Sequence, residues 1–478
     1  MGRLMSTIAL VVVLAGLGAY IYFVDSERPA AGVEDKEKVF AVEADKIEEI
    51  TVTSDAQTTA LRKVDGTWRM TAPMQADADQ TEISSLTTNL STLEVNRVVE
   101  ENASNLAEYG LANPRITIAF KGQGGVSGEL KLGDKTATQS DLYAMKPGEK
   151  RVFLVPAFHE TTFAKKPFDL RDKRVLNFER DKVDSIDVDQ NGVVVQLARS
   201  GSDWVVKQPI QARGDYSAIE ALITKLATTS MTKIVEGGTS KLADYGLDKP
   251  VARITLGAGS SRATLAIGKE EDGAVYAQDQ GRGIVFTIDP TVATDLKKPA
   301  DEYRDKDLFE FRNFNAARLR VTRGNDTYDF QKVAGTGENA ADQWQLVVYG
   351  ADGGTKVASR GVDAAKMDDV LSKLVALRAQ SFVPAGNTTG LDKPTMVVSV
   401  SYDDGKFERV RMARTAEAFA ARDGEPGAAK LDVTAYDDVI KALDAAVAVA
   451  APPAPAAAPA PPPEAAPTPP PATKPPTP

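Results

Sequence analysis

The chain has no cysteine and a single histidine, His159. The first absence excludes disulfides, thiolate metal sites and cysteine nucleophiles together. The second excludes a zinc site built from several histidines, and a Ser-His-Asp triad would have to use His159. Basic residues are also in deficit, with 57 Lys and Arg against 67 Asp and Glu and a formal net charge of −10. A nucleic-acid partner is therefore not expected, because such a partner requires a basic face.

The amino-terminal segment contains the longest apolar run. Residues Leu4–Val24 form 21 positions without a charge, and about 20 suffice to cross a bilayer. We expect residues 1–24 to be an uncleaved single-pass anchor in the inner membrane, followed by a linker over 25–38. Arg3 places the amino terminus in the cytoplasm and the bulk of the chain in the periplasm. The alternative is a cleaved signal peptide with a weak site at Pro29-Ala30-Ala31.

The carboxyl-terminal segment, residues 450–478, consists almost entirely of proline and alanine. Its only charged residues are Glu464 and Lys474. Such a composition cannot form a core, so a disordered tail with polyproline II character is predicted.

Between these ends the chain repeats itself. Leu106-Ala107-Glu108-Tyr109-Gly110-Leu111-Ala112-Asn113-Pro114 returns 136 residues later as Leu242-Ala243-Asp244-Tyr245-Gly246-Leu247-Asp248-Lys249-Pro250. A shorter copy follows as Gly390-Leu391-Asp392-Lys393-Pro394. Self-similarity at a fixed offset indicates duplicated structural units. We predict three units, over residues 39–176, 177–309 and 310–449, the last of them divergent.

The repeated stretch reads locally as a structural turn. Its glycine can end a short helix in the left-handed conformation, after which leucine enters the core. Proline then favours the entrance to a strand. The alternative is a ligand-binding turn that uses the tyrosine hydroxyl, but the third copy has Thr389 in place of tyrosine.

Each unit is expected to combine strands with a helix. Period-two runs begin at Lys46, Lys182 and Ala317, and each leads to a tryptophan strand at Trp68, Trp204 or Trp344. These tryptophans are expected in the core, although an aromatic carbohydrate platform is the alternative. Helices with one apolar face are predicted after the N-cap residues Asp79, Asp215 and Asp363. Further strands and a short helix complete an α+β unit on an antiparallel sheet.

Charged connectors recur between units. Asp169-Leu170-Arg171-Asp172-Lys173 corresponds to Glu302-Tyr303-Arg304-Asp305-Lys306. We expect salt bridges between units here, and a binding role is the alternative.

No stretch carries a catalytic signature. His159 is expected to be a surface or capping residue rather than a catalytic or metal-binding one. Gly257-Ala258-Gly259-Ser260-Ser261-Arg262 lacks the spacing of a phosphate loop and is interpreted as a hairpin turn. We therefore assign no catalytic, cofactor-binding or metal-binding residue, and expect no cofactor and no enzymatic activity.

The combined pattern resembles the bacterial family called domain of unknown function 4340. It is carried by the tryptophan strand, the aspartate-capped helix, Tyr-Gly-Leu-x-x-Pro, the strand ends Leu132-Gly133 and Ile267-Gly268, and the Arg-Asp-Lys connector, over about residues 39–447. The resemblance implies a membrane-anchored extracytoplasmic protein. It further implies genes that neighbour ABC-type transporter components, similar to those implicated in gliding motility. No catalytic residues are implied.

These observations lead to one hypothesis and two alternatives. The hypothesis is an accessory or scaffold protein of an ABC-type envelope transport system, with permease or auxiliary subunits as partners. The first alternative is a module that binds an envelope glycan or lipid. The second, an enzyme that uses carboxylates, has no residue pattern to support it.

Overall fold

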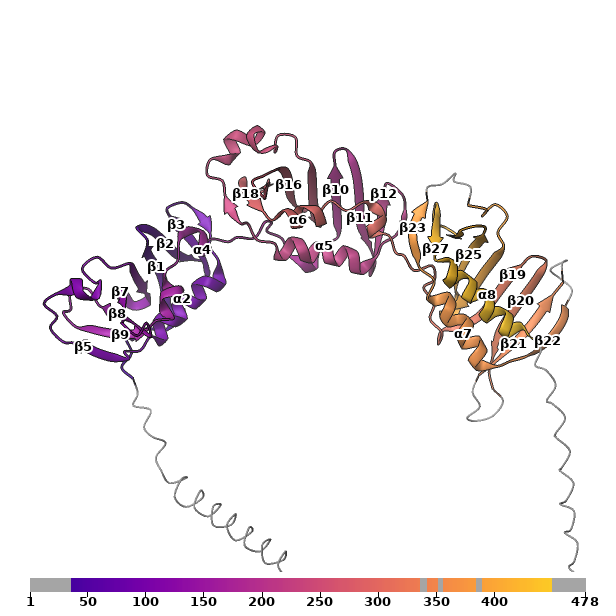
Figure 1. The fold of residues 1–478 in the computed structure, drawn as a ribbon, viewed down its shortest axis with the longest axis horizontal. Coiled ribbons are helices and arrows are strands. Elements are labelled where there is room, and N and C mark those ends of the chain that lie inside the picture. The colour runs from indigo at the N-terminus through magenta and orange to yellow at the C-terminus, as the bar shows by residue number, and fades with distance from the viewer. Residues whose placement is uncertain (1–35, 336–341, 351–355, 384–388, 449–478) are drawn as a thin grey trace, which may run out of the picture. The chain divides into compact units, whose positions relative to one another are not determined.

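The computed structural model describes residues 36–335, 342–350, 356–383 and 389–448. They contain three nine-stranded antiparallel sheets (Figure 1). Contacts between Cα atoms divide the chain into two compact units, Met1–Val193 with Ala221–Lys297 and Val194–Glu220 with Lys298–Pro478. The three sheets are therefore described one at a time.

The first sheet is built from the first repeat. Its connections include the short helices η2 (Ala44–Lys46), η3 (Leu106–Tyr109) and η4 (Gln123–Gly125), and its helices are α2 (Gln80–Thr92), α3 (His159–Phe163) and α4 (Pro167–Leu170). From edge to edge the strands are β4 (Ala76–Asp77), β3 (Thr67–Ala72), β2 (Gln57–Val64), β1 (Ile47–Ser54), β6 (Ile116–Gly122), β7 (Ser127–Lys135), β8 (Asp141–Met145), β9 (Val152–Pro156) and β5 (Arg97–Glu100).

The second sheet has the same strand order. Its helices are η5 (Arg180–Lys182), α5 (Tyr216–Thr228), η6 (Gly238–Tyr245), α6 (Pro290–Asp295) and η7 (Ala300–Tyr303). Its strands are β13 (Ala212–Arg213), β12 (Asp203–Gln208), β11 (Val193–Ser200), β10 (Ser185–Gln190), β15 (Ala252–Ala258), β16 (Ser261–Glu271), β17 (Ala274–Asp279), β18 (Ile284–Ile288) and β14 (Lys233–Ile234).

The third sheet repeats the order again, so the divergent third unit is a true copy. Its helices are α7 (Ala364–Val375), η8 (Asp403–Gly405) and α8 (Val433–Val447). Its strands are β22 (Lys356–Val362), β21 (Gln343–Tyr349), β20 (Asp326–Val333), β19 (Ala316–Arg323), β24 (Met396–Tyr402), β25 (Lys406–Arg414), β26 (Ala418–Arg422), β27 (Ala428–Leu431) and β23 (Ala379–Val383).

Helices cover one face of each sheet and leave the other face open (Figure 1). In the third sheet, Leu319 and Val321 of β19 are buried in one core cluster with Leu371 of α7 and Val439 of α8. Strand side chains alternate between the two faces, so the intervening residues of β19 lie on the open face. The three predicted N-caps are confirmed, because the side chains of Asp79, Asp215 and Asp363 accept backbone hydrogen bonds at the starts of α2, α5 and α7.

The repeated turn has the predicted conformation. Gly110 and Gly246 end η3 and η6 with φ angles of +67° and +66°. Leu111 and Leu247, which follow them, are buried. The strand-end glycines have a matching role, because a Cβ atom at Gly133 would lie 2.0 Å from the carbonyl oxygen of Tyr109. Gly110 of the turn and Gly133 of β7 thus allow the backbone of the turn to approach the backbone of β7 closely.

Two predicted segments lie outside the described residues, namely the anchor within residues 1–24 and the Pro/Ala tail over 450–478, and almost all of the linker does so too. Among the helices that the structure does describe, none is both long and apolar enough to cross a membrane. The unit boundaries drawn from the sequence remain predictions.

Candidate functional site

His159 is buried, so its prediction as a surface or capping residue is wrong. It begins α3 and only 5% of its surface is exposed. Its ring lies between Phe158 and Phe163, with centroid separations of 4.1 and 5.5 Å. Burial lowers the pKa of His159 to about 4, so the imidazole is neutral at pH 7. His159 is therefore buried against two rings, the exposed one of Phe158 and the buried one of Phe163.

The other singled-out residues have the structural roles that the sequence predicts. Gly259 and Ser260 form the two-residue turn between β15 and β16, where Ala258 pairs with Ser261. Each tryptophan is buried, with exposed fractions of 6% for Trp68, 1% for Trp204 and 6% for Trp344.

The first connector makes the salt bridges expected between repeats. Asp172 pairs with Arg174 at 2.7 Å and lies 3.8 Å from Arg282, in the turn between β17 and β18. The Arg282 guanidinium also donates to the carbonyl oxygen of Arg174. These residues all lie within the first compact unit. The connector is therefore tied to the second repeat by buried charges.

The second connector has a larger network, within the second compact unit. Arg213 of β13 contacts Asp305 at 2.7 Å, Glu310 at 3.2 Å and Glu425 at 2.5 Å. Glu425 lies in the turn between β26 and β27, at the position that Arg282 occupies in the second repeat. The Arg213 side chain borders a hollow of about 750 Å³. The side chains that line this hollow include five carboxylates and three arginines, so its net charge is negative.

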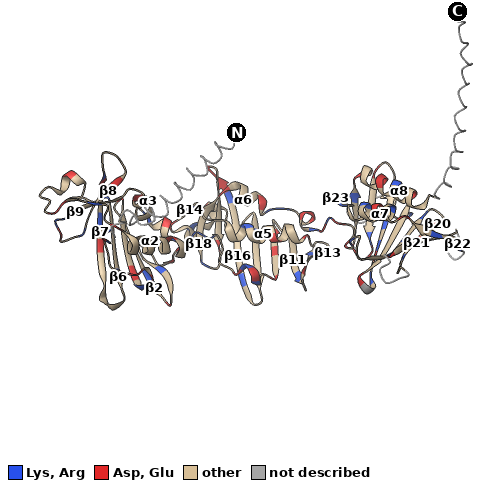
Figure 2. Cartoon of the chain, turned by 90° about the horizontal axis from the view of Figure 1, so that it is seen from below, with Lys and Arg blue, Asp and Glu red and all other residues tan. Residues whose placement is uncertain are grey.

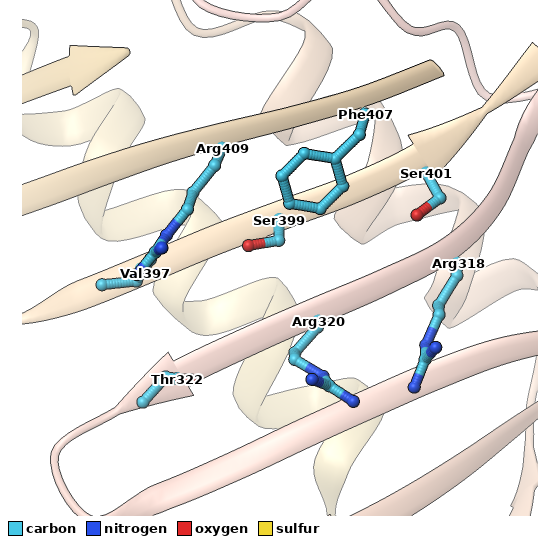
Figure 3. A pocket seen from close by; sticks show the side chains of 8 residues that line it. All are labelled: Arg318, Arg320, Thr322, Val397, Ser399, Ser401, Phe407 and Arg409. Carbon is cyan, nitrogen blue, oxygen red and sulfur yellow. The ribbon is translucent and has the colours of Figure 1, made fainter. Parts of the chain in front are cut away.

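A net positive charge gathers instead on the open face of the third sheet. Arg318 and Arg320 project from β19 and share one carboxylate, Asp329 of β20, whose side chain is fully buried. The nitrogens Nε of Arg318 and Nη2 of Arg320 donate to it at 2.7 and 2.9 Å. Burial alone would raise the pKa of Asp329, but these hydrogen bonds outweigh it and hold that pKa below its ordinary value. The two guanidinium groups are therefore fixed beside each other (Figure 3).

The neighbouring strands complete this surface. Arg409 and Arg411 of β25 both approach Asp423, at 3.8 and 3.4 Å. The hydroxyl residues Ser399 and Ser401 of β24 lie between Arg318 and Arg320 on one side and Arg409 on the other (Figure 3). Phe407, with 63% of its surface exposed, stands beside them. We call the four arginines, with Ser399, Ser401, Phe407, Thr322 and Val397, the arginine face; all of these residues except Arg411 line a hollow of about 420 Å³.

The arginine face is specific to the third repeat, although Lys and Arg occur on all three (Figure 2). The cross-strand register identifies six equivalent open-face positions in each sheet. In the first sheet they carry one Lys and two Glu, net −1: Glu49, Thr51, Ala119, Lys121, Ser127 and Glu129. In the second they carry one Asp and one Arg, net zero: Ser185, Asp187, Thr255, Gly257, Arg262 and Thr264. In the third they carry three Arg, net +3: Arg318, Arg320, Ser399, Ser401, Phe407 and Arg409.

Sequence reasoning missed the arginine face, although two signals for it exist. Arg318-Leu319-Arg320 and Arg409-Val410-Arg411 alternate with period two, which places both arginines of each pair on one face of a strand. That the two pairs share one face depends on the pairing of β19, β24 and β25.

No group of three His, Asp or Glu side chains able to hold a metal ion occurs in the part of the chain that the structure describes. The fold defines a tandem array of α+β repeats, each an antiparallel sheet with one covered and one open face. The chain belongs to the family described as "Domain of unknown function (DUF4340)", whose model matches residues 68–228 and 204–394. The two matches begin at Trp68 and Trp204, at the offset of the repeat.

No match was found among curated proteins. Among solved structures, the chain is similar to the DNA polymerase III subunit beta from Pseudomonas aeruginosa, at 8% identity over 81% of this chain and 93% of that chain, with a TM-score of 0.15. A second structure, the same sliding clamp bound to griselimycin, matches at 8% identity over 83% and 93%, also with a TM-score of 0.15. Such TM-scores carry no argument about fold or function.

Proposed function

We propose that the chain is a non-enzymatic accessory or scaffold protein of the cell envelope, working beside an ABC-type transport system. The proposal rests on one observation: the three sheets share their strand order but differ in the charge of their open faces. All three sheets have one strand order, while six equivalent open-face positions change from net −1 to zero to +3. Repeat proteins use such a repeated support to present extended binding surfaces, which suits a scaffold.

The proposed location follows from the amino-terminal sequence. Leu4–Val24 anchors the chain in the inner membrane with its amino terminus in the cytoplasm, and the repeats lie in the periplasm. A reporter that is active only in the periplasm, fused after Val449, should be active. An inactive fusion after Val449, together with an active fusion of the same reporter ahead of Met1, would require the opposite orientation.

The scaffold role is tested by purifying the full-length protein from native membranes in mild detergent. We expect transporter permease or auxiliary subunits at a fixed ratio, identified by mass spectrometry. Loss of these subunits on exchange of Leu4–Val24 for an unrelated anchor would assign the contact to the membrane segment. Their retention would assign it to the repeats. Recovery of the protein alone would contradict the proposal.

A second candidate function is a module that binds an envelope glycan or lipid. The arginine face favours it, because its arginines and hydroxyl groups supply donors for an anionic ligand.

A further inference from the structure

We propose that the arginine face binds an acidic glycan, a sugar chain whose residues carry carboxylate groups. This inference rests on the second candidate function and names its ligand. It does not require the transporter partners of the first.

The charge balance of the face calls for an anion. Four arginines, Arg318, Arg320, Arg409 and Arg411, are set against two carboxylates, Asp329 and Asp423, which leaves a net charge of +2. Between 42% and 49% of each arginine side chain is exposed. Each guanidinium offers five N–H donors, so donors remain for a ligand after the internal pairs have formed.

The arginines are held against the sheet rather than extended into solvent. Asp329, itself fully buried, accepts hydrogen bonds from two of them. Fixing the planar guanidinium groups in advance lowers the entropic cost of binding a carboxylate. This fixation also keeps the arginine side chains from extending outward to a lipid surface. The ligand must therefore bind flat against the sheet.

The remaining side chains favour a sugar over an acidic peptide. Ser399 and Ser401 place hydroxyl groups among the arginines, where they can pair with sugar hydroxyls (Figure 3). The exposed ring of Phe407 offers an apolar surface on which a sugar ring can stack. A peptide would gain most from backbone pairing, but the backbones of β19 and β24 are already paired on both sides within the sheet.

The test uses the full-length protein in neutral detergent and measures binding by titration calorimetry. The probes are oligogalacturonate, an uncharged galactose oligosaccharide of equal length, poly-glutamate, and vesicles of phosphatidylglycerol. We expect oligogalacturonate to bind and the uncharged sugar to bind at least tenfold more weakly. Affinity should also fall as salt is raised, because the contacts are ionic.

Variants then locate the site. Arg320→Gln with Arg409→Gln should weaken oligogalacturonate binding at least tenfold. Phe407→Ser, which copies Ser127 of the first sheet, should weaken it several-fold without changing charge. Arg62→Gln, on the open face of the first sheet, should leave it within twofold. Denaturation midpoints close to wild type would show that each variant is folded.

Several outcomes would overturn the proposal. If oligogalacturonate does not bind, or if the Arg62→Gln control loses as much affinity as the double variant, the arginine face is not the binding site. Tighter binding of poly-glutamate, unchanged by Phe407→Ser, would show that the ligand is an acidic peptide. Binding to vesicles alone would show that the ligand is a membrane surface. Co-purification of transporter subunits by the double variant would show that the scaffold role is independent of this site.

Discussion

Arg213 donates from Nε to Oε1 of Glu425 at 2.5 Å, joining β13 to the turn between β26 and β27. The position of Glu425 is occupied in the preceding repeat by Arg282, which faces Asp172 instead. The turn residue thus changes sign from one junction to the next. The repeats are therefore not interchangeable, because a turn placed at the wrong junction would meet a like charge.

The Arg213–Glu425 pair should be strongly coupled. Their side chains are 21% and 17% exposed, and removing one partner of a largely buried pair leaves the other charge without compensation. We expect Arg213→Leu to lower the free energy of unfolding by about 3 kcal/mol. A double-mutant cycle with Glu425→Gln should give a coupling of about 1 kcal/mol or more. The exposed Arg62–Glu49 pair serves as the control and should give about 0.5 kcal/mol.

Reversing the charge of Arg282, in the turn between β17 and β18, should destabilise the contact between this turn and the first connector. Arg282→Glu places a carboxylate beside Asp172 and Asp279, whose side chains are 7% and 5% exposed. We expect a loss of about 2 kcal/mol and faster amide hydrogen exchange in residues 171–174. Lys207→Glu, at an exposed position of β12, makes the same charge change as a control. Equal exchange in the two variants would count against an ionic junction.

Gly133 should not tolerate a side chain. A Cβ atom there would lie 2.0 Å from the carbonyl oxygen of Tyr109, while Gly361 has no atom within 4 Å of such a Cβ. Gly133→Ala should cost about 1–3 kcal/mol, because backbone must shift to make room. Gly361→Ala should change stability by less than about 0.5 kcal/mol. Denaturant unfolding at constant slope m checks both, and similar values for the two variants would contradict the close approach.

His159 should make stability dependent on pH below neutrality, because its pKa differs between the folded and the unfolded chain. Its pKa falls from 6.5 to about 4 on burial, so the unfolded chain binds more protons than the folded one between these values. Stability should be fully present above pH 6.5 and decline as the pH falls toward 4, by about 2 kcal/mol between pH 7.5 and 5. His159→Phe, which keeps the ring stack, should remove this decline. An unchanged decline would assign it to another group.

Asp329 should contribute to acid unfolding. Its pKa is depressed in the folded state because, against the effect of burial, Arg318 and Arg320 hydrogen-bond to its charged form. The stabilisation is therefore present above the ordinary carboxyl pKa and is lost as the pH falls through the lower, folded value. Asp329→Asn should lower stability by about 1–3 kcal/mol at pH 7, and by less at pH 3. A loss independent of pH would show that packing, rather than charge, dominates.

The sequence predicts the central strands better than the edges. Strands such as β1 and β2 follow from period-two patterns, and the N-caps from single aspartates. The edge strands β5, β14 and β23 were not predicted, because they are short and pair with strands much later in the chain. The alanine-rich β26 and β27 were missed as well, since alanine has low strand propensity and only their partners hold them extended.

The sequence by itself determined the duplication, the α+β class, the turns and the core tryptophans. These features depend on local spacing, which a repeat shows again and again. The tertiary structure alone decided the arginine face and the reversed junction charges. Arg320 and Arg409 become neighbours through β24, and Arg213 meets Glu425 across two repeats, so no local pattern records either contact. Strand pairing between distant segments creates these surfaces, and with them the candidate site.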